Sequence, residues 1–438
     1  MDRRSFIALT GATALSTTLP RMAHAADATK ITLWHAMGGR LGEVVNEIAT
    51  RFNADQSAAM LEPAYKGGYE DTLTSVIAAF RAGEHPNIAQ VFDAGAATII
   101  GAPGAVAAAE DLLAETGVAF DPNDYIDGVR YFYADSAGKM IGMPFNSSTP
   151  ILYYNEDALK KAGVTPPKTW EEFQEIAPKL KEAGYVPLAQ SHLPWIFTEN
   201  FFSRHNLQFA TNNNGFDGAE GTKLLINTPE IKMHFARVKE WLDAGLFGFY
   251  GTGWNDNQAA FETGKAAMWL GSSGSFGGLL KSTNFPFSAT FLPYWKEITE
   301  QPYSTFIGGA ALFALSGKPA EENRATAEFF KYLSSPEIQY YWHKETGYVP
   351  ITKAAYEMAK MDGHYERFPA AEIGILQLNE RAGEWTRGYR LGYYVQIRDV
   401  MNREYGRIFS GETDVDTAFA TIESEANALL DRFARTTG

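Results

Sequence analysis

Short apolar runs alternate with amphipathic helical segments early in the chain, and this alternation constrains the fold more than any other feature. Residues 31–34, 58–66 and 87–92 predict strands bounded by polar or turn-forming residues. Between them, apolar residues recur at helical spacing over residues 41–52 and 73–80. Strands that alternate with helices in this way are typical of α/β architecture.

The alternation continues beyond residue 150. Residues 151–154 predict another strand, followed by a short helix that Gly163 ends. Thr169 is expected to cap the next helix, which starts at Trp170. A length of 438 residues favours two or three domains. No linker-like segment is evident, so we expect several short crossings between domains. Further helical faces are expected around residues 228–244, 321–334 and 413–434.

The N-terminus has the layout of an export signal. Arg3 and Arg4 precede a weakly apolar run over residues 6–19, and Ala23-His24-Ala25 supplies a small-x-small cleavage site. The paired arginines resemble a twin-arginine signal, so residues 1–25 are assigned as a signal peptide. The alternative is a cytoplasmic N-terminal helix. The signal predicts a soluble protein of the periplasm.

Composition excludes several classes of protein. The formal net charge of −14 argues against a general nucleic-acid binder. The absence of cysteine excludes disulfides, thiolate metal sites and a cysteine nucleophile. The eight histidines form no HExxH or HxH pair, and neither GxSxG nor a Walker-type loop occurs. We therefore expect no metal, no cofactor and no catalysis, with a secreted hydrolase that uses paired carboxylates kept as an alternative.

Two polar segments next to apolar strands are candidate ligand contacts. Residues 271–278, GSSGSFGG, follow a predicted strand at 266–270 and lead into a helix, which suits the capture of an anion by backbone N–H groups and hydroxyls. Residues 145–149, FNSST, lie between two predicted strands and suit a crossover lined with hydrogen-bond donors. Both segments are equally compatible with ordinary turns. The 13% aromatic content allows rings to line a cleft for polyols or sugars.

Several longer motifs carry a family resemblance. Residues 139–173, 260–268 and 330–352 resemble the extracellular solute-binding proteins of ABC importers. Over essentially the whole mature length, the chain is similar to the sn-glycerol-3-phosphate-binding members that serve the Ugp importer. The motifs that carry this closer resemblance are WHAMGG (34–39), YKGGYE (65–70), PFNSSTPILYYN (144–155), NNNGFDG (212–218), SSGS (272–275), IGGA (307–310), TGYVPITKAAY (346–356) and RLGYYVQIR (390–398).

The resemblance implies a two-lobed α/β fold with a hinge and a ligand cleft between the lobes. By analogy the chain crosses between lobes near residues 146, 306 and 352. Lobe 1 is then 27–146 plus 307–352, and lobe 2 is 147–306 plus 353–438. It implies capture of sn-glycerol-3-phosphate, or of a glycerophosphodiester such as glycerophosphocholine, by lobe closure. The partners implied are a membrane permease with a cytoplasmic ATPase behind it, and the receptor itself is expected to be a monomer.

The ligand contacts of this family fall on six positions that also make chemical sense. Arg398 offers a planar fork that matches phosphate oxygens. The serines are compact hydroxyl donors, the glycine lets a backbone N–H approach the anion, and the tyrosines donate while covering the carbon skeleton. These positions are Tyr69, Ser148, Ser272, Gly309, Tyr348 and Arg398.

Two positions depart from the family pattern. Asp93 stands where the family has a glutamate that accepts the glycerol hydroxyls. Trp195 keeps one of two usual tryptophans, but His192 stands at the place of the other. The smaller ring leaves room for a phosphodiester, or else His192 hydrogen-bonds to the phosphate. A sugar or oligosaccharide receptor of the same fold is the second hypothesis, favoured by the aromatic content and Trp195.

Overall fold

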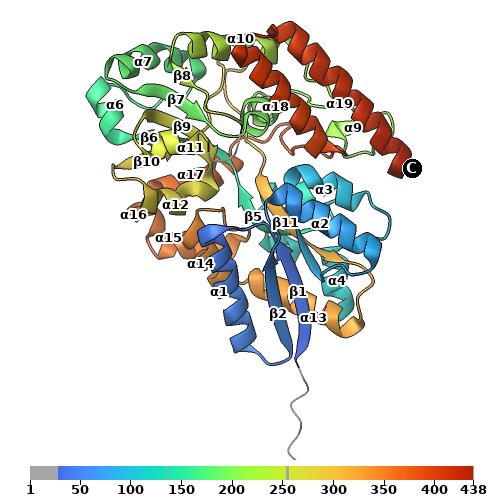
Figure 1. Ribbon diagram of the computed structural model, residues 1–438. Coiled ribbons are helices and arrows are strands. Elements are labelled where there is room, and N and C mark those ends of the chain that lie inside the picture. The colour runs from blue at the N-terminus through green and yellow to red at the C-terminus, as the bar shows by residue number, and fades with distance from the viewer. Residues whose placement is uncertain (1–27, 136, 253–255, 438) are drawn as a thin grey trace, which may run out of the picture.

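The computed structural model describes residues 28–135, 137–252 and 256–437, which form two α/β lobes (Figure 1). The first lobe contains a six-stranded sheet in the order β2-β1-β3-β11-β4, with β5 also paired to β11. The second lobe contains a five-stranded sheet in the order β10-β6-β9-β7-β8. The predicted signal peptide lies outside the described residues. Along the described ranges, no helix combines the length and the apolar character needed to cross a bilayer.

The first sheet opens with the predicted strand–helix alternation. Strands β1, β2 and β3 are parallel, and each is followed by a helix. The strand predictions at 31–34, 58–66 and 87–92 are confirmed, as are both helices between them. These elements are β1 (Thr29–His35), α1 (Gly39–Asp55), β2 (Ala59–Tyr65), α2 (Tyr69–Ala82), β3 (Ile88–Phe92) and α3 (Asp93–Ile100).

Later segments complete the first lobe. Strand β11 pairs antiparallel with β3, β4 and β5, so a strand from the C-terminal half closes the sheet. The remaining elements of this part are β4 (Val106–Ala107), α4 (Ala109–Thr116), η1 (Pro122–Asp124), α5 (Asp127–Arg130), η2 (Tyr131–Tyr133), β5 (Met143–Ser148), β11 (Gly308–Leu315), α13 (Ala320–Leu333) and α14 (Pro336–Thr346).

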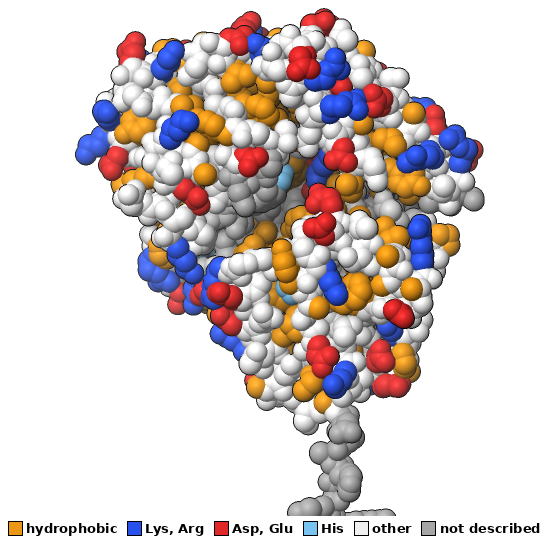
Figure 2. Space-filling model, in the orientation of Figure 1, with side chains coloured by type: hydrophobic (Ala, Val, Ile, Leu, Met, Phe, Trp, Pro, Cys, Tyr) orange, Lys and Arg blue, Asp and Glu red, His pale blue; other side chains and the backbone are white. Residues whose placement is uncertain are grey.

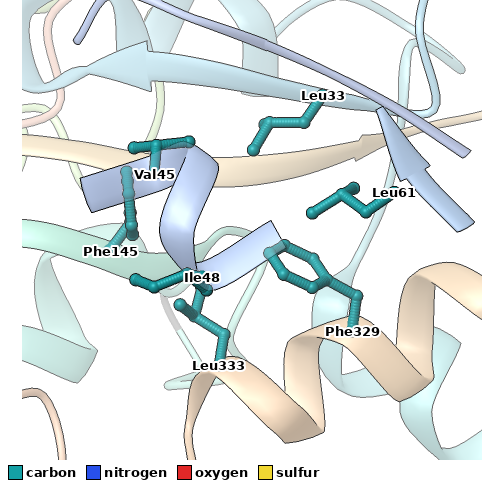
Figure 3. A pocket seen from close by; sticks show the side chains of 7 residues that line it. All are labelled: Leu33, Val45, Ile48, Leu61, Phe145, Phe329 and Leu333. Atoms are coloured by element: carbon teal, nitrogen blue, oxygen red, sulfur yellow. The ribbon is translucent and has the colours of Figure 1, made fainter. Parts of the chain in front are cut away.

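The core of the first lobe is densely packed. Side chains from β1, α1, β2, β5 and α13 converge on one point, where they leave a void of only about 10 Å³ (Figure 3). A void so small and apolar has no room or partners for an ordered ligand. It belongs to the hydrophobic core that holds the sheet rigid. Its walls are Leu33, Val45, Ile48, Leu61, Phe145, Phe329 and Leu333.

The second lobe repeats the α/β plan with local signals that behave as predicted. Gly163 has φ 66 and ends α6, and the side chain of Thr169 accepts a hydrogen bond from the N–H of Glu172 at the start of α7. Its elements up to the return into the first sheet are β6 (Pro150–Asn155), α6 (Glu156–Ala162), α7 (Trp170–Glu182), β7 (Val186–Gln190), the π-helical turn η3 (Pro194–Glu199), α8 (Asn200–Arg204), α9 (Thr211–Asn214), α10 (Pro229–Asp243), β8 (Phe247–Gly248), α11 (Gln258–Glu262), β9 (Ala266–Ser272), η4 (Ser273–Ser275), α12 (Phe276–Ser282) and β10 (Phe287–Thr290).

The C-terminal helices pack on elements of both lobes. Helix α18 packs on α19 and α10, and it also contacts α3 of the first lobe (Figure 1). The helical predictions at 228–244, 321–334 and 413–434 are confirmed by α10, α13 and α19. The C-terminal elements are α15 (Lys353–Met361), α16 (His364–Arg367), α17 (Pro369–Leu378), α18 (Tyr394–Ser410) and α19 (Val415–Thr437).

The sequence left two possibilities open for residues 145–149, a crossover lined with hydrogen-bond donors and an ordinary turn. Residues 145–148 do not form the turn but lie inside strand β5, which pairs with β11 from Gly308↔Ser148 to Leu312↔Met143. Pairing with a strand 160 positions along the chain decides their conformation. Only Thr149 separates β5 of the first sheet from β6 of the second.

Candidate ligand-binding site

A cavity of about 810 Å³ lies between the two lobes, and Figure 2 shows the molecule hollowed at this level. Its volume is within the range of about 300–1,000 Å³ usual for small-molecule sites. All nine residues that the sequence predicts as ligand contacts line it. They are Tyr69, Asp93, Ser148, His192, Trp195, Ser272, Gly309, Tyr348 and Arg398.

The first lobe turns its helix N-termini toward this cavity. Strands β1, β2 and β3 are parallel, so their carboxyl ends share one edge of the sheet, and α1, α2 and α3 begin there. The residues that start these helices, Gly39, Tyr69 and Asp93, all line the cavity. Backbone N–H groups of a first helical turn have no partner within the helix, so this wall favours a ligand with anionic or acceptor atoms.

Tyr69 is held by a buried amide. Asn146 on β5 donates from Nδ2 to the Tyr69 hydroxyl at 2.7 Å. Gln90 fixes the other end of this amide, because its Nε2 donates to Asn146 Oδ1 at 2.8 Å. Burial raises the pKa of Tyr69 and that of Tyr348, so each phenol stays protonated and able to donate. Asn146 was missed as a supporting residue, although it lies in the polar segment that the sequence singled out.

Gly309 allows the backbone of β11 to approach β5 and the cavity. Its φ is +98, and a Cβ there would lie 1.9 Å from the carbonyl oxygen of Asn146. Only glycine accommodates this conformation and this contact. The neighbouring pair Gly308↔Ser148 places the Ser148 side chain at the same edge of the sheet.

The glycine- and serine-rich segment contributes the opposite wall. The predicted strand at 266–270 is β9, and Ser272 at its end accepts a hydrogen bond from the N–H of Gly274 at 3.1 Å. The ring of Tyr348 lies against Gly274, where a Cβ would be 2.6 Å from the ring. The second lobe therefore brings Ser272 to the first lobe's tyrosines. We call Tyr69, Ser148, Ser272, Gly309 and Tyr348 the hydroxyl pocket.

Arg398 does not present the free fork expected from the sequence. Its Nη1 and Nη2 donate to Asp93 at 3.0 and 3.1 Å, and its Nε and Nη2 donate to Glu199 at 2.8 and 2.7 Å. Tyr389 donates to Glu199 at 3.0 Å and accepts from Arg398 at 3.1 Å. Burial disfavours the charge of Arg398, but Asp93 and Glu199 outweigh it and raise its pKa further. We call Asp93, Glu199 and Arg398 the carboxylate–arginine cluster.

Glu199 and Tyr389 are partners of Arg398 that the sequence reasoning missed. Glu199 is fully buried, at the end of the π-helical turn that also carries Trp195. The sequence did contain a sign that Glu199 is unusual, because it is a lone carboxylate at the end of the apolar run PWIFTE. A buried carboxylate needs a partner, but the sequence does not show that the partner is Arg398.

Trp195 and His192 line another part of the cavity. The indole of Trp195 lies against Gly308, where a Cβ would be 2.6 Å from the ring, and His192 packs edge-on to it with ring centroids 6.3 Å apart. Burial, together with the charge of Arg398, lowers the pKa of His192 well below 6.5, so its imidazole is neutral. His192 therefore brings no positive charge to a phosphate. Within the described part of the chain, no three His, Asp or Glu side chains gather closely enough to hold a metal ion.

Two α/β lobes that enclose a cavity of ligand size define the class of two-lobed ligand-binding proteins. The sequence pattern of the bacterial extracellular solute-binding proteins matches residues 47–369, and the chain belongs to this family. It is similar to the sn-glycerol-3-phosphate-binding periplasmic protein UgpB of Escherichia coli K12, with 39% identity over 432 residues, 97% of this chain and 98% of that protein. Identity to UgpB of Rhizobium meliloti is 40% over 409 residues, which cover 92% and 94% of the two chains.

Solved structures support the fold. UgpB from Mycobacterium tuberculosis in complex with glycerophosphocholine matches with a TM-score of 0.77 at 22% identity, over 92% of this chain and 99% of that one. The GacH receptor of Streptomyces glaucescens, solved unliganded and with acarbose, also gives 0.77 at 18% identity, over 92% and 98%. At these identities the likeness establishes the two-lobed fold alone.

Proposed function

We propose that this protein is the periplasmic solute-binding subunit of an ABC importer and that it captures sn-glycerol-3-phosphate or a glycerophosphodiester such as glycerophosphocholine. The observation that carries the proposal is the hydroxyl pocket beside the carboxylate–arginine cluster in one cavity. The near-full-length relatives named as sn-glycerol-3-phosphate-binding periplasmic proteins support the ligand class and the location.

The phosphate binds in the hydroxyl pocket. Two phenols that burial keeps protonated and two serine hydroxyls face the cavity there, beside helix N-termini. Hydrogen bonds to a charged group contribute roughly 1.5–3 kcal/mol each, so four or five such donors offset the immobilisation of a small ligand. Arg398 is less suited to this task, because two carboxylates already occupy its fork.

The glycerol hydroxyls bind at the carboxylate–arginine cluster. Asp93 supplies acceptor oxygens, and Nη1 of Arg398 makes one hydrogen bond to Asp93 although it carries two N–H bonds. A hydroxyl both donates and accepts, so it fits between these groups. Asp93 thus keeps the role of the longer glutamate, with Arg398 as its partner.

A phosphodiester fits the same orientation. Besides Ser272, the second lobe lines the cavity with Ser275, Gly278 and Lys281. A headgroup on the second ester oxygen has this polar wall available, and the neutral His192 leaves room beside Trp195. This supports glycerophosphodiesters alongside the monoester without ranking the two.

Lobe closure delivers the ligand. The proposed lobes are residues 27–146 plus 307–352 and residues 147–306 plus 353–438, and the short step from β5 to β6 across Thr149 supports a crossing near residue 146. Ligand between the lobes draws them together about these crossings. The partners are a membrane permease and its ATPase. The receptor is a monomer, and it acts by binding its ligand, without a cofactor and without catalysis.

Calorimetric titration tests the proposal. One-to-one binding of sn-glycerol-3-phosphate or glycerophosphocholine at micromolar affinity, about −8.2 kcal/mol, is the expected result. The matched control is maltose, because the rings of Trp195 and Tyr69 also suit a sugar. Binding of maltose with silence toward both phosphates would overturn the proposal, as would turnover of either phosphate ester.

A further inference from the structure

We infer that Glu199 is a positioning residue that makes the Arg398 end of the cavity select an uncharged polyol group and reject a second anionic group. The inference rests on the proposed function, with phosphate in the hydroxyl pocket. Glu199 lies behind Arg398 and does not line the cavity itself. It therefore acts on the ligand only through the arginine.

The contacts fix Arg398 from behind. The carboxylate of Glu199 accepts two hydrogen bonds, from Nε and Nη2 of Arg398, and the Glu199 side chain is completely buried. Tyr389 adds a third donor to the same carboxylate at 3.0 Å. Burial raises the pKa of Glu199, whereas the charge of Arg398 and the hydrogen bonds from Arg398 and Tyr389 act in the opposite direction and favour the ionised carboxylate. The same contacts hold Arg398 with its Nη1 and Nη2 edge toward Asp93.

The charges then favour a neutral ligand end. One guanidinium faces two carboxylates, so the carboxylate–arginine cluster has a net charge of −1. Among the described residues, neither His192 nor Arg390 balances it, because His192 is neutral and Arg390 donates instead to the carbonyl oxygens of Phe132 and Ala134. Asp399, next to Arg398 on the cavity wall, adds a further negative charge. A ligand carboxylate here meets like charge at close range, whereas a hydroxyl does not.

Two ligands of nearly equal size separate the effect of ligand charge from the effect of ligand size. Glycerol 3-phosphate and 3-phosphoglycerate share the phosphate and the carbon chain, but a carboxylate replaces the terminal CH₂OH in the second. The wild-type protein should bind glycerol 3-phosphate at least a hundredfold more tightly. Electrostatic rejection, rather than size, would be the cause.

The test compares the ratio of the two dissociation constants in three proteins. Glu199→Gln keeps the shape of the side chain and removes one negative charge, so the ratio should shrink by about tenfold or more. Glu404→Gln is the matched control, since Glu404 is equally buried on α18 and pairs with Arg403 and Arg407 away from the cavity. It should leave the ratio unchanged.

The outcomes are distinct. If Glu199→Gln weakens both ligands in equal proportion, or leaves the ratio as in wild type, the inference is overturned and Glu199 is only structural. If Glu199→Gln does not fold, Asp93→Asn removes the other carboxylate and should shrink the ratio as well, and an unchanged ratio there overturns the inference. Failure of the wild type to bind glycerol 3-phosphate would instead overturn the proposed function.

Discussion

Asp93 of the first lobe and Arg398 of the second lobe face each other through two hydrogen bonds of 3.0 and 3.1 Å. Asp93 begins α3 and Arg398 lies on α18, so this pair joins two helices of different lobes at the wall of the cavity. The ligand that we propose lies against the same two groups. We therefore expect the affinity for this ligand to depend on the Asp93–Arg398 ion pair.

Replacing Arg398 should abolish most of the binding. Arg398→Ala leaves two carboxylates without their cation, and the affinity for sn-glycerol-3-phosphate should fall by about a hundredfold or more. Arg398→Lys keeps the charge but loses the planar fork, and a loss of about tenfold is expected. Calorimetry measures both. Arg403→Ala, an exposed arginine of the same helix, should bind as wild type, and unchanged affinity in Arg398→Ala would contradict this role.

The glycine at position 309 should tolerate no side chain. In Gly309→Ala the Cβ meets the carbonyl of Asn146 at 1.9 Å in a conformation with φ +98, so a loss of about 3 kcal/mol in unfolding free energy is expected. Gly406→Ala is the control, because Gly406 lies in α18 with open space around its Cβ position. That variant should gain up to about 1 kcal/mol from helix propensity. Urea denaturation compares the two, and equal stabilities would refute the argument.

The asparagines of NNNGFDG form a left-handed turn. Asn212, Asn213 and Asn214 have φ of 52, 53 and 54, a conformation that costs other residues roughly 1–2 kcal/mol each. Asn213 is exposed, so Asn213→Gly should stabilise the protein by about 1 kcal/mol. Asn214 is buried, and its side chain accepts from the N–H groups of Phe209 and Ala210 and donates to the Gly388 carbonyl. Asn214→Gly should therefore destabilise by about 2 kcal/mol, and thermal unfolding that moved both variants the same way would contradict the assignment.

Buried histidines should make stability fall in acid. Burial lowers the pKa of His343 to about 4 and that of His205 to about 3, whereas an unfolded histidine titrates near 6.5. As the pH falls below 6.5, the unfolded chain takes up protons that the folded chain does not, so stability is complete above 6.5 and declines toward 4. At pH 5 each group should cost about 2 kcal/mol relative to pH 7. His343→Gln should flatten this decline in urea titrations, and an unchanged slope would exclude His343 as a contributor.

Local signals in the sequence predict much of the fold. Gly163 and Thr169 end and cap their helices through contacts within three or four residues, which a sequence displays directly. For residues 145–149 the sequence left a crossover and an ordinary turn equally open, because the pairing of this segment with β11 is long-range and has no local signature.

The sequence likewise predicts one part of the candidate site and not another. Family motifs pointed to nine residues, and the structure gathers all nine around one cavity. The partners of Arg398 were not foreseen, since Glu199 and Asp93 are 199 and 305 positions away in sequence. These distant carboxylates decide whether the guanidinium of Arg398 is free to bind a phosphate or is already paired, and the sequence alone does not show which.

The most direct test of the central claim is a crystal structure of the protein with sn-glycerol-3-phosphate. We expect the phosphate within hydrogen-bond distance of Ser148, Ser272 and Tyr348, and the glycerol hydroxyls between Asp93 and Arg398. Phosphate on Arg398, with Asp93 displaced from the guanidinium, would contradict the orientation. Ligand outside this cavity would contradict the function itself.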